Sequence, residues 1–284
     1  MQKVLIAGST GYLGRYVVKE AKKQGYWIRA LVRNKNKVDG LEPYIDEVFE
    51  AEVTRPEALV GICDGIDYVI SSIGITRQKD GLTYMDVDYQ GNRNLLNEAV
   101  QQNVKKFIYV SVLNAHKMKD LKIIQAKERF VEDLKTSNLD YSIIRPTGFF
   151  SDMLEFLRMA NKGKVYLFGN GQNEINPIHG GDLAEICVDA IIEKEKEINI
   201  GGPVAYTYKE IAELAFKGLN KPAKISMMPM WMIRLVLPII RTFSSSKTYG
   251  PLEFMMSVMT MDVLGELYGK YNLKDFILEN TVRV

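Results

Sequence analysis

Residues 4–14 read VLIAGSTGYLG, an apolar run followed by a turn that contains Gly8, Gly11 and Gly14. The apolar run at 4–7 predicts a buried strand, and residues 15–24 have the pattern of a helix. In dinucleotide-binding proteins such a turn lets the backbone approach a pyrophosphate, which lies at the positive end of the helix dipole. The spacing here is G-x-x-G-x-x-G rather than G-x-G-x-x-G. The alternative is an ordinary glycine turn that binds nothing.

The composition is that of an ordinary globular protein. Of the 284 residues 46% are hydrophobic and 25% are charged, and the net charge is +2, which gives no global case for nucleic-acid binding. No uncharged apolar run reaches the length of a membrane span, so no transmembrane helix is expected. Cys63 and Cys187 lack metal-ligand spacing. We therefore expect two reduced thiols, no metal site and, without a signal peptide, a cytoplasmic protein.

Strand-length and helix-length segments alternate along the chain. Strands are predicted at 27–32, 48–53, 67–71, 106–111 and 141–145, and helices at 85–102 and 122–136. This alternation predicts an α/β protein with a doubly wound parallel sheet of the Rossmann type. We expect a nucleotide-binding core at 1–150. Residues 151–284 are expected to return to the core at about 175–200 and to form a small C-terminal substrate lobe.

The residues after the second predicted strand bear on the choice of cofactor. An acidic residue at this point would hydrogen-bond the ribose 2′-hydroxyl of NAD, but Arg33, Lys35 and Lys37 stand here instead. Arg33 can pair with a 2′-phosphate. The sequence thus favours NADP over NAD, and the alternative is a solvated basic loop.

Several segments together resemble the short-chain dehydrogenase/reductase superfamily. They are VLIAGSTGYLG, the basic turn, DVDYQGNRNLLNEA, FIYVS, RPTGFF and NPIHGGDLAEI, which extend from Val4 to about Ala190. The nearest likeness is to the atypical, NmrA-like branch, which is similar to isoflavone-reductase-type and complex-I-accessory-subunit-type proteins. These matches do not specify a substrate.

The resemblance implies a set of cofactor contacts at the carboxyl ends of the strands. Thr10, Tyr12 and Leu13 would contact the phosphates, and Glu52 and Val53 would flank the adenine. The other implied contacts are Ser72, Ile73 and Gly74 at the ribose and phosphate edge, Ser111 near the nicotinamide, and Pro146, Thr147, Gly148 and Phe149 near the carboxamide.

The catalytic set of the superfamily is changed at three of its four positions. Its members place a Tyr four residues before a Lys, which lowers the Tyr pKa so that the hydroxyl can exchange a proton with the substrate. Lys127 is present, but the Tyr position holds Ile123. The usual Ser aligns with Val112, and the usual Asn aligns with Asp88. Lys127 is therefore a candidate cofactor ligand and proton donor, and the alternative is a surface lysine on a charged helix.

Other polar residues have structural and functional interpretations. Asn114 and His116 could supply another proton donor, and His179 either faces the substrate or hydrogen-bonds the backbone. Asp182, with Glu185 three residues on, is expected to cap a helix at 183–192. Thr207 and Glu210 predict a capping box that opens a helix ending near residue 219.

The C-terminal third is rich in apolar residues. Residues 227–241 combine methionines with an apolar run and two arginines. They predict a helix of the substrate lobe, a substrate pocket or, over 227–243, a peripheral membrane contact. Residues 254–256 add a second apolar cluster, and Phe149 and Phe150 are expected at the substrate mouth. Together these features favour a hydrophobic ligand.

The function that follows is an NADP(H)-dependent reductase of a small hydrophobic substrate. The first alternative is a non-catalytic NAD(P)H-binding protein that senses redox state or assists the assembly of a partner complex. A sugar-nucleotide epimerase or dehydratase ranks third, because that chemistry needs the absent Tyr. The sequence does not determine the substrate or the oligomeric state.

Overall fold

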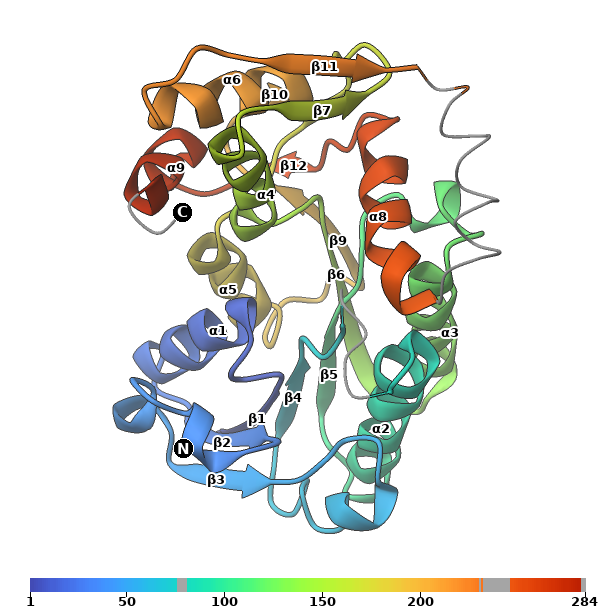
Figure 1. Ribbon diagram of the computed structural model, residues 1–284. Helices are drawn as coiled ribbons and strands as arrows, with labels where there is room; N and C mark the ends of the chain where they lie inside the picture. Colours follow the sequence, from blue (N-terminus) through green and yellow to red (C-terminus); the bar gives the residue numbers. More distant parts are fainter. Residues whose placement is uncertain (76–80, 230, 232–245, 282–284) are drawn as a thin grey trace.

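The centre of the fold is an eight-stranded parallel sheet (Figure 1). It is seen in a computed structural model that describes residues 1–75, 81–229, 231 and 246–281. The strand order is β12-β9-β6-β5-β4-β1-β2-β3, and all neighbouring strands run parallel, which confirms the predicted doubly wound sheet. The strands are β1 (Lys3–Ala7), β2 (Trp27–Val32), β3 (Glu47–Glu50), β4 (Tyr68–Ser71), β5 (Lys106–Val110), β6 (Asp140–Pro146), β9 (Glu197–Gly201) and β12 (Glu266–Leu267).

Helices cover both faces of the sheet. One face carries α1 (Tyr12–Lys23) and α5 (Gly180–Asp189), and the other carries the π-helix η4 (Met85–Gly91), α2 (Asn92–Gln101) and α3 (Lys122–Thr136). Alternate residues of a strand point to opposite faces, so Val4 and Ile6 pack with α1, while Leu5 and Ala7 lie in the core that includes α3. Burial on both faces explains the continuous apolar strands. Short 3₁₀ helices are η1 (Lys35–Lys37), η2 (Glu42–Tyr44), η3 (Pro56–Leu59) and η5 (Ala115–Lys117).

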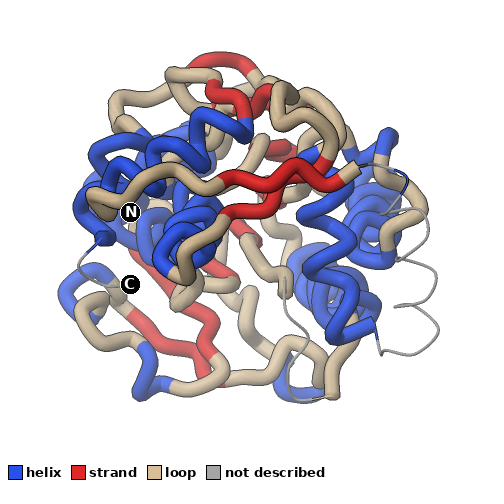
Figure 2. The backbone as a smooth tube through the Cα atoms, turned by 45° about the horizontal axis from the view of Figure 1, so that its top comes forward, coloured by secondary structure: helices blue, strands red, loops and turns tan. Residues whose placement is uncertain are grey.

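A smaller lobe with its own apolar core lies beyond the carboxyl edge of the sheet. Its elements are α4 (Phe150–Asn161), β7 (Val165–Phe168), β8 (Glu174–Ile175), β10 (Tyr206–Thr207), α6 (Tyr208–Gly218), β11 (Ile225–Met228), α8 (Ser246–Met259) and α9 (Leu273–Asn280). Figure 2 shows β7 and β11 side by side on the outside of the lobe's helices. In α8, Val258 packs against both the lobe core and the core under α3. The lobe is therefore joined to the sheet layer through this helix.

Several element boundaries differ from the sequence-based expectations. Helix α1 begins at Tyr12, three residues early, and the segment 85–102 is divided into η4 and α2. The third strand ends at Glu50. Met227 and Met228 lie in strand β11, and most of 227–243 lies outside the described residues. The Thr207–Glu210 capping box is confirmed.

The expectation that Asp182 caps a helix at 183–192 is wrong. Helix α5 begins at Gly180, and its N-cap is His179, whose Nδ1 accepts a hydrogen bond of 3.1 Å from the Gly181 N–H. The buried Asp182 carboxylate instead accepts hydrogen bonds from the backbone N–H groups of Lys270 and Tyr271. Asp182 thereby ties α5 to the loop after β12.

The cap at His179 sits in an aromatic cluster that joins three parts of the chain. The imidazole lies 5.0 Å from the Tyr16 ring and 4.0 Å from the Tyr271 ring, measured between ring centroids. Next to it, the Tyr12 hydroxyl accepts a hydrogen bond from the Gly180 N–H. Burial lowers the pKa of His179 below its usual value, so the folded protein favours the neutral imidazole that capping requires.

We expect this cap to make the stability depend on pH. Because the His179 pKa is lower in the folded state, its contribution is complete above the unfolded pKa near 6.5 and is lost as the pH falls below it. Over that range the free energy of unfolding should fall by up to about 1.4 kcal/mol per pH unit. His179→Asn keeps a capping side chain that does not titrate and should flatten this dependence. Denaturant titrations from neutral to mildly acidic pH measure it.

The matched control is His116→Asn, because His116 is exposed and is the other histidine of the chain. This variant should keep the pH dependence of the unmodified protein. An unchanged slope in His179→Asn would contradict the role assigned to the cap.

Candidate functional site

The glycine turn brings the start of α1 to the carboxyl end of β1. Gly8 has φ of +84°, a backbone conformation that side chains rarely adopt, and a Cβ atom on Gly14 would overlap the Gly8 carbonyl. Helix α1 starts after Gly11 with no side-chain cap and no acidic residue in its first turn. Its first backbone N–H groups are therefore suited to an anion such as a pyrophosphate.

The residues predicted to contact the phosphates around this turn differ in how exposed they are to solvent. Gly11 is exposed and Thr10 is half-buried, whereas the Leu13 side chain belongs to the core, so only its backbone can meet a phosphate. Tyr12 uses its hydroxyl to bind the Gly180 N–H, and its ring lies 5.8 Å from that of Phe149. Tyr12 thus links the turn to the end of β6.

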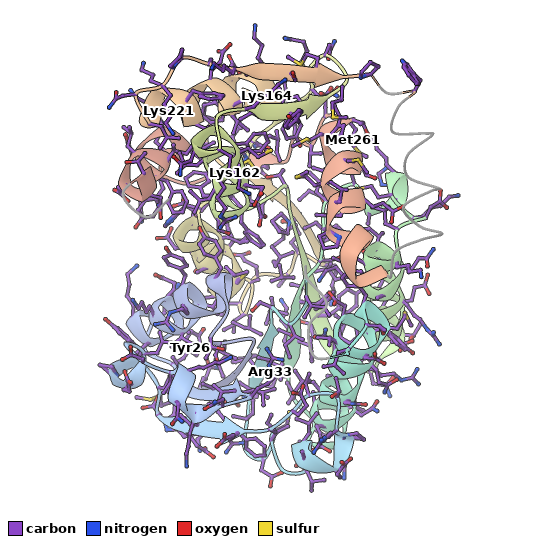
Figure 3. The ribbon with its side chains drawn as sticks, in the orientation of Figure 1. Tyr26, Arg33, Lys162, Lys164, Lys221 and Met261 are labelled. Atoms are coloured by element: carbon purple, nitrogen blue, oxygen red, sulfur yellow. The ribbon has the colours of Figure 1, made fainter. Side chains whose placement is uncertain are left out.

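The residue that follows β2, Arg33, places a positively charged side chain at the carboxyl edge of the sheet. Arg33 is exposed and makes no ion pair within the described part of the chain (Figure 3). Asn34 caps η1 by accepting a hydrogen bond from the Asn36 N–H, which orders the loop that carries Lys35 and Lys37. Since β1 and β2 are neighbours in the sheet, Arg33 follows the strand next to the glycine turn.

The predicted adenine and ribose residues lie at the ends of β3 and β4. Glu52 is half-buried and Val53 is buried, with its side chain against Gly91 of η4. The Ser72 hydroxyl donates to the Ala7 carbonyl and fills the space beside Gly8. Ile73 is buried, whereas Gly74 is exposed. The strand order reverses between β1 and β4, which is where ligands of doubly wound sheets bind.

Beneath Gly74 lies a buried ion pair. The Lys127 ammonium is 3.0 Å from Asp88 Oδ1, with side-chain exposures of 11% and 0%. The interpretation of Lys127 as a surface lysine is therefore wrong. A Cβ atom on Gly74 would lie 2.8 Å from the Lys127 ammonium nitrogen and 2.7 Å from Asp88 Oδ1. The lack of a side chain at Gly74 leaves the ammonium open to the carboxyl edge of the sheet.

Tyr109 completes this buried cluster and was not predicted. Its ring centroid is 5.6 Å from the Lys127 ammonium, and the whole tyrosine side chain is buried. Burial raises the Tyr109 pKa to about 12. For Lys127, burial acts to lower the pKa, but Tyr109 and the Asp88 carboxylate outweigh it and raise the pKa above its usual value. The lysine is therefore protonated at neutral pH.

A signal for this burial exists in the sequence of α3. Ile123, Lys127 and Val131 follow one another at a spacing of four, so Lys127 lies on the same helix face as its apolar neighbours. Ile123 and Val112 have hydrocarbon side chains, so neither of these two positions of the usual relay offers a proton.

The residues at the ends of β5 and β6 are largely occupied by structural contacts. The Ser111 hydroxyl donates to Glu128, which also binds Arg145 of β6 in a bidentate ion pair. The Thr147 hydroxyl donates to the Asn176 carbonyl, and Pro146 is buried at the end of β6. Gly148 and Phe149 are half-buried. Of this group, Gly148 and Phe149 are the better placed to meet a ligand.

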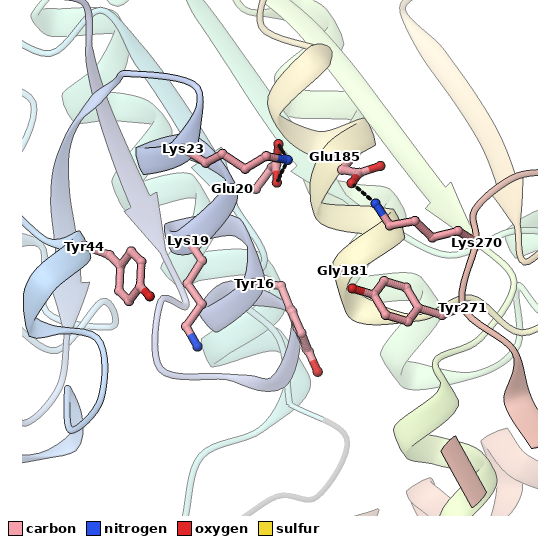
Figure 4. A pocket seen from close by; sticks show the side chains of 9 residues that line it. All are labelled: Tyr16, Lys19, Glu20, Lys23, Tyr44, Gly181, Glu185, Lys270 and Tyr271. Carbon is pink, nitrogen blue, oxygen red and sulfur yellow. Dashed lines mark hydrogen bonds and ion pairs between the residues drawn. The ribbon is translucent and has the colours of Figure 1, made fainter. Parts of the chain in front are cut away.

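The other candidates lie apart from this edge. His116 is exposed in η5, and Asn114 donates to the Asp262 carbonyl. A surface pocket of about 340 Å³ lies between α1, α5 and the loop after β12, lined by Tyr16, Lys19, Tyr44 and Tyr271 among others (Figure 4). It contains none of the residues predicted to hold the cofactor. Within the described ranges, no cluster of three His, Cys, Asp or Glu could hold a metal, and no helix is long and apolar enough to span a membrane.

These residues fit a nicotinamide dinucleotide. The uncapped start of α1 suits the pyrophosphate, and Arg33 is free for a 2′-phosphate. The open space at Gly74 allows a ribose hydroxyl to approach the Lys127 ammonium, which a side chain would prevent. Such a cofactor, when bound, supplies a hydride.

Comparison with known proteins shows similarity to nicotinamide-nucleotide-binding proteins. A family model described as NAD(P)H-binding matches residues 8–194. Photosystem II assembly factor Ycf39 of Trieres chinensis is 28% identical over 84% of this chain and 76% of its own length. The chloroplastic divinyl chlorophyllide a 8-vinyl-reductase of Arabidopsis thaliana is 28% identical over 96% of this chain and 75% of its own length.

Solved structures share the fold. An NADPH-dependent quinone oxidoreductase of Escherichia coli, solved with NADPH, has a TM-score of 0.77 at 18% identity and covers 97% of this chain and 99% of its own. A UDP-glucose 4-epimerase of Thermus thermophilus, solved with NAD, has a TM-score of 0.67 at 16% identity, covering 90% and 99%. The chain therefore belongs to the NAD(P)H-binding family, as its likeness to atypical short-chain dehydrogenases/reductases predicted.

Proposed function

We propose that the protein is an NADP(H)-dependent reductase of a hydrophobic substrate, with Lys127 at its centre. The observation that carries this proposal is the buried Lys127–Asp88 pair beneath Gly74. A buried ion pair adds little net stability, and a perturbed charge in a ligand-binding edge is typical of a functional site. A binding protein needs the glycine turn and Arg33, but it has less need of this pair.

Different residues of the chain have different roles in such a reduction. The start of α1 and Arg33 hold the phosphates, and Asp88 keeps the Lys127 ammonium charged and in place. Reduction of a conjugated double bond or carbonyl adds one hydride and one proton. Lys127 is the candidate donor of that proton and regains it from solvent, because Ile123 and Val112 have no proton to give.

The hydrophobic substrate class is supported by the lobe and by two similar proteins. Leu252, Phe254 and Met255 of α8 are half-buried apolar side chains on the helix that joins the lobe to the sheet layer. The similar proteins include a reductase of a vinyl group and a quinone oxidoreductase by name. A cytoplasmic location stays a prediction.

A non-catalytic assembly or sensor role is the second candidate. It is favoured by the apolar Ile123 and Val112 at relay positions and by similarity to a photosystem II assembly factor. An epimerase or dehydratase is less well supported, because the Tyr needed for that chemistry is absent.

We expect NADPH to bind at least several-fold more tightly than NADH. Arg33→Ala should remove most of that difference, because losing a charged hydrogen-bonding partner costs about 1.5–3 kcal/mol. Isothermal calorimetry with both nucleotides measures it, and Lys117→Ala, at an exposed lysine of η5, is the control that should leave it unchanged. Equal affinities of the unmodified protein for the two nucleotides would contradict the choice of NADP.

We expect Lys127→Met to abolish the oxidation of NADPH by apolar enones and quinones. The single change leaves the buried Asp88 carboxylate without its ion-pair partner and should destabilise the fold by about 3–5 kcal/mol. The double variant Lys127→Met with Asp88→Asn removes both charges, so it should recover stability and remain inactive. Absorbance of NADPH and thermal unfolding separate the two effects.

Two outcomes would count against this function. Turnover that persists in a folded Lys127→Met variant would refute the role of the lysine as proton donor. Tight NADPH binding by the unmodified protein, without turnover of any apolar enone, quinone or vinyl compound, would favour the assembly or sensor role.

A further inference from the structure

Basic residues are concentrated in two stretches of the chain. Residues 156–173 and 214–252 contain nine lysines and arginines and no aspartate or glutamate. The rest of the chain has 28 basic against 35 acidic residues, so the overall charge of +2 hides a strong asymmetry. Strands β7 and β11 lie one in each stretch and pair from Val165 with Ile225 to Phe168 with Met228. The fold thus brings the two stretches together.

Four lysines flank these paired strands. Lys162 and Lys164 precede β7, and Lys221 and Lys224 precede β11; all four are exposed. Within the described part of the chain, no carboxylate pairs with any of them: Lys221 binds the Asn161 carbonyl and side-chain oxygens, and the Lys164 ammonium lies 5.3 Å from the Tyr166 ring centroid. Figure 3 shows Lys164 and Lys221 at the end of the molecule away from Arg33.

Large apolar side chains are exposed beside these lysines. In β7, Val165 and Leu167 are fully buried, whereas Tyr166 between them is 46% exposed. Trp231, three residues beyond the end of β11, is 62% exposed. Tyrosine and tryptophan, with an apolar body and a polar tip, are enriched where proteins meet the headgroup region of a bilayer.

We propose that the β7–β11 face, formed by Lys162, Lys164, Tyr166, Lys221, Lys224 and Trp231, binds the surface of a membrane that contains anionic lipids. Lysines near such a surface are attracted by its negative potential, and the exposed aromatic side chains can enter the interfacial layer. Neither signal alone gives stable attachment, but the face carries both. The cations of this face are lysines, point charges that suit a diffuse layer of headgroups rather than bidentate recognition of single phosphates.

Vesicle binding by the full chain tests this proposal. The probes are vesicles of phosphatidylcholine alone and vesicles in which a third of it is replaced by phosphatidylserine. We expect co-sedimentation with the anionic vesicles that weakens as salt is raised. The triple variant Lys162→Glu, Lys164→Glu, Lys224→Glu should bind about 100-fold more weakly, given the contribution of each lysine near such a surface.

A matched control has the same change in net charge elsewhere. Lys117→Glu, Lys119→Glu, Lys194→Glu alters three exposed lysines outside the β7–β11 face and should lower binding much less. Tryptophan fluorescence adds a local readout, because the chain has two tryptophans and Trp27 lies half-buried in β2. The emission should shift to the blue on binding, and Trp231→Phe should remove that shift. Circular dichroism confirms that each variant is folded.

Several results would overturn the proposal. They are a lack of binding to anionic vesicles, an equal loss in both triple variants, or a blue shift that survives in Trp231→Phe. Tighter binding to single-stranded RNA than to the vesicles, lost in the same lysine variant, would assign the face to nucleic acid instead. None of these measurements depends on turnover, so they stand apart from the test of the reductase.

Discussion

The close approach of helix α1 to the end of strand β1 is the constraint on which the candidate nucleotide site depends. A Cβ atom on Gly14 would overlap the carbonyl of Gly8, and Gly8 itself holds a positive φ beside the Ser72 hydroxyl. A side chain at Gly14 would push the helix away from the strand, and one at Gly8 would clash with Ser72. The free N–H groups of α1 would then no longer point to the edge where β1 and β4 separate. The same contact sets Tyr12 against α5, so the turn also positions the second helix of that layer.

Buried charge forms a second constraint on the opposite face of the sheet. Asp88 of η4 and Lys127 of α3 pair in the interior, and Asp88 also accepts a hydrogen bond from the Ile75 N–H. Breaking such a pair is costly because one charge remains without a partner. The pair thus fixes α3, η4 and the loop after β4 relative to one another. It presents an ammonium group at a point where Gly74 lacks a side chain.

The two ends of the molecule have different electrostatic character. The end with the candidate nucleotide site carries Arg33 next to a helix start without acidic residues, which suits a compact, highly charged ligand. The lobe end carries lysines beside exposed aromatic side chains, which suits a broad surface. Helix α8 connects the lobe core to the core under α3 through Val258, so these two ends belong to one packed body.

Local features of this protein follow from the sequence alone. The glycine turn, the buried strands, the bounds of α3 at 122–136 and the capping box at Thr207 depend on residues within a few positions of one another. Periodicity and capping chemistry report such short-range interactions directly. For this reason the sequence patterns alone predict the doubly wound sheet and a nicotinamide dinucleotide as the cofactor.

Contacts between residues that are far apart in the sequence depend on the tertiary structure. Asp88, Tyr109 and Lys127 come from three elements, and their contact depends on how η4 and α3 pack on β5. His179 rather than Asp182 caps α5, because the Asp182 carboxylate accepts hydrogen bonds from backbone N–H groups of the loop after β12, some 90 residues away. The pairing of β7 with β11 likewise joins residues sixty positions apart. Spacing in the chain fixes the face on which a residue lies, but the partner of that face is set by the packing of whole elements.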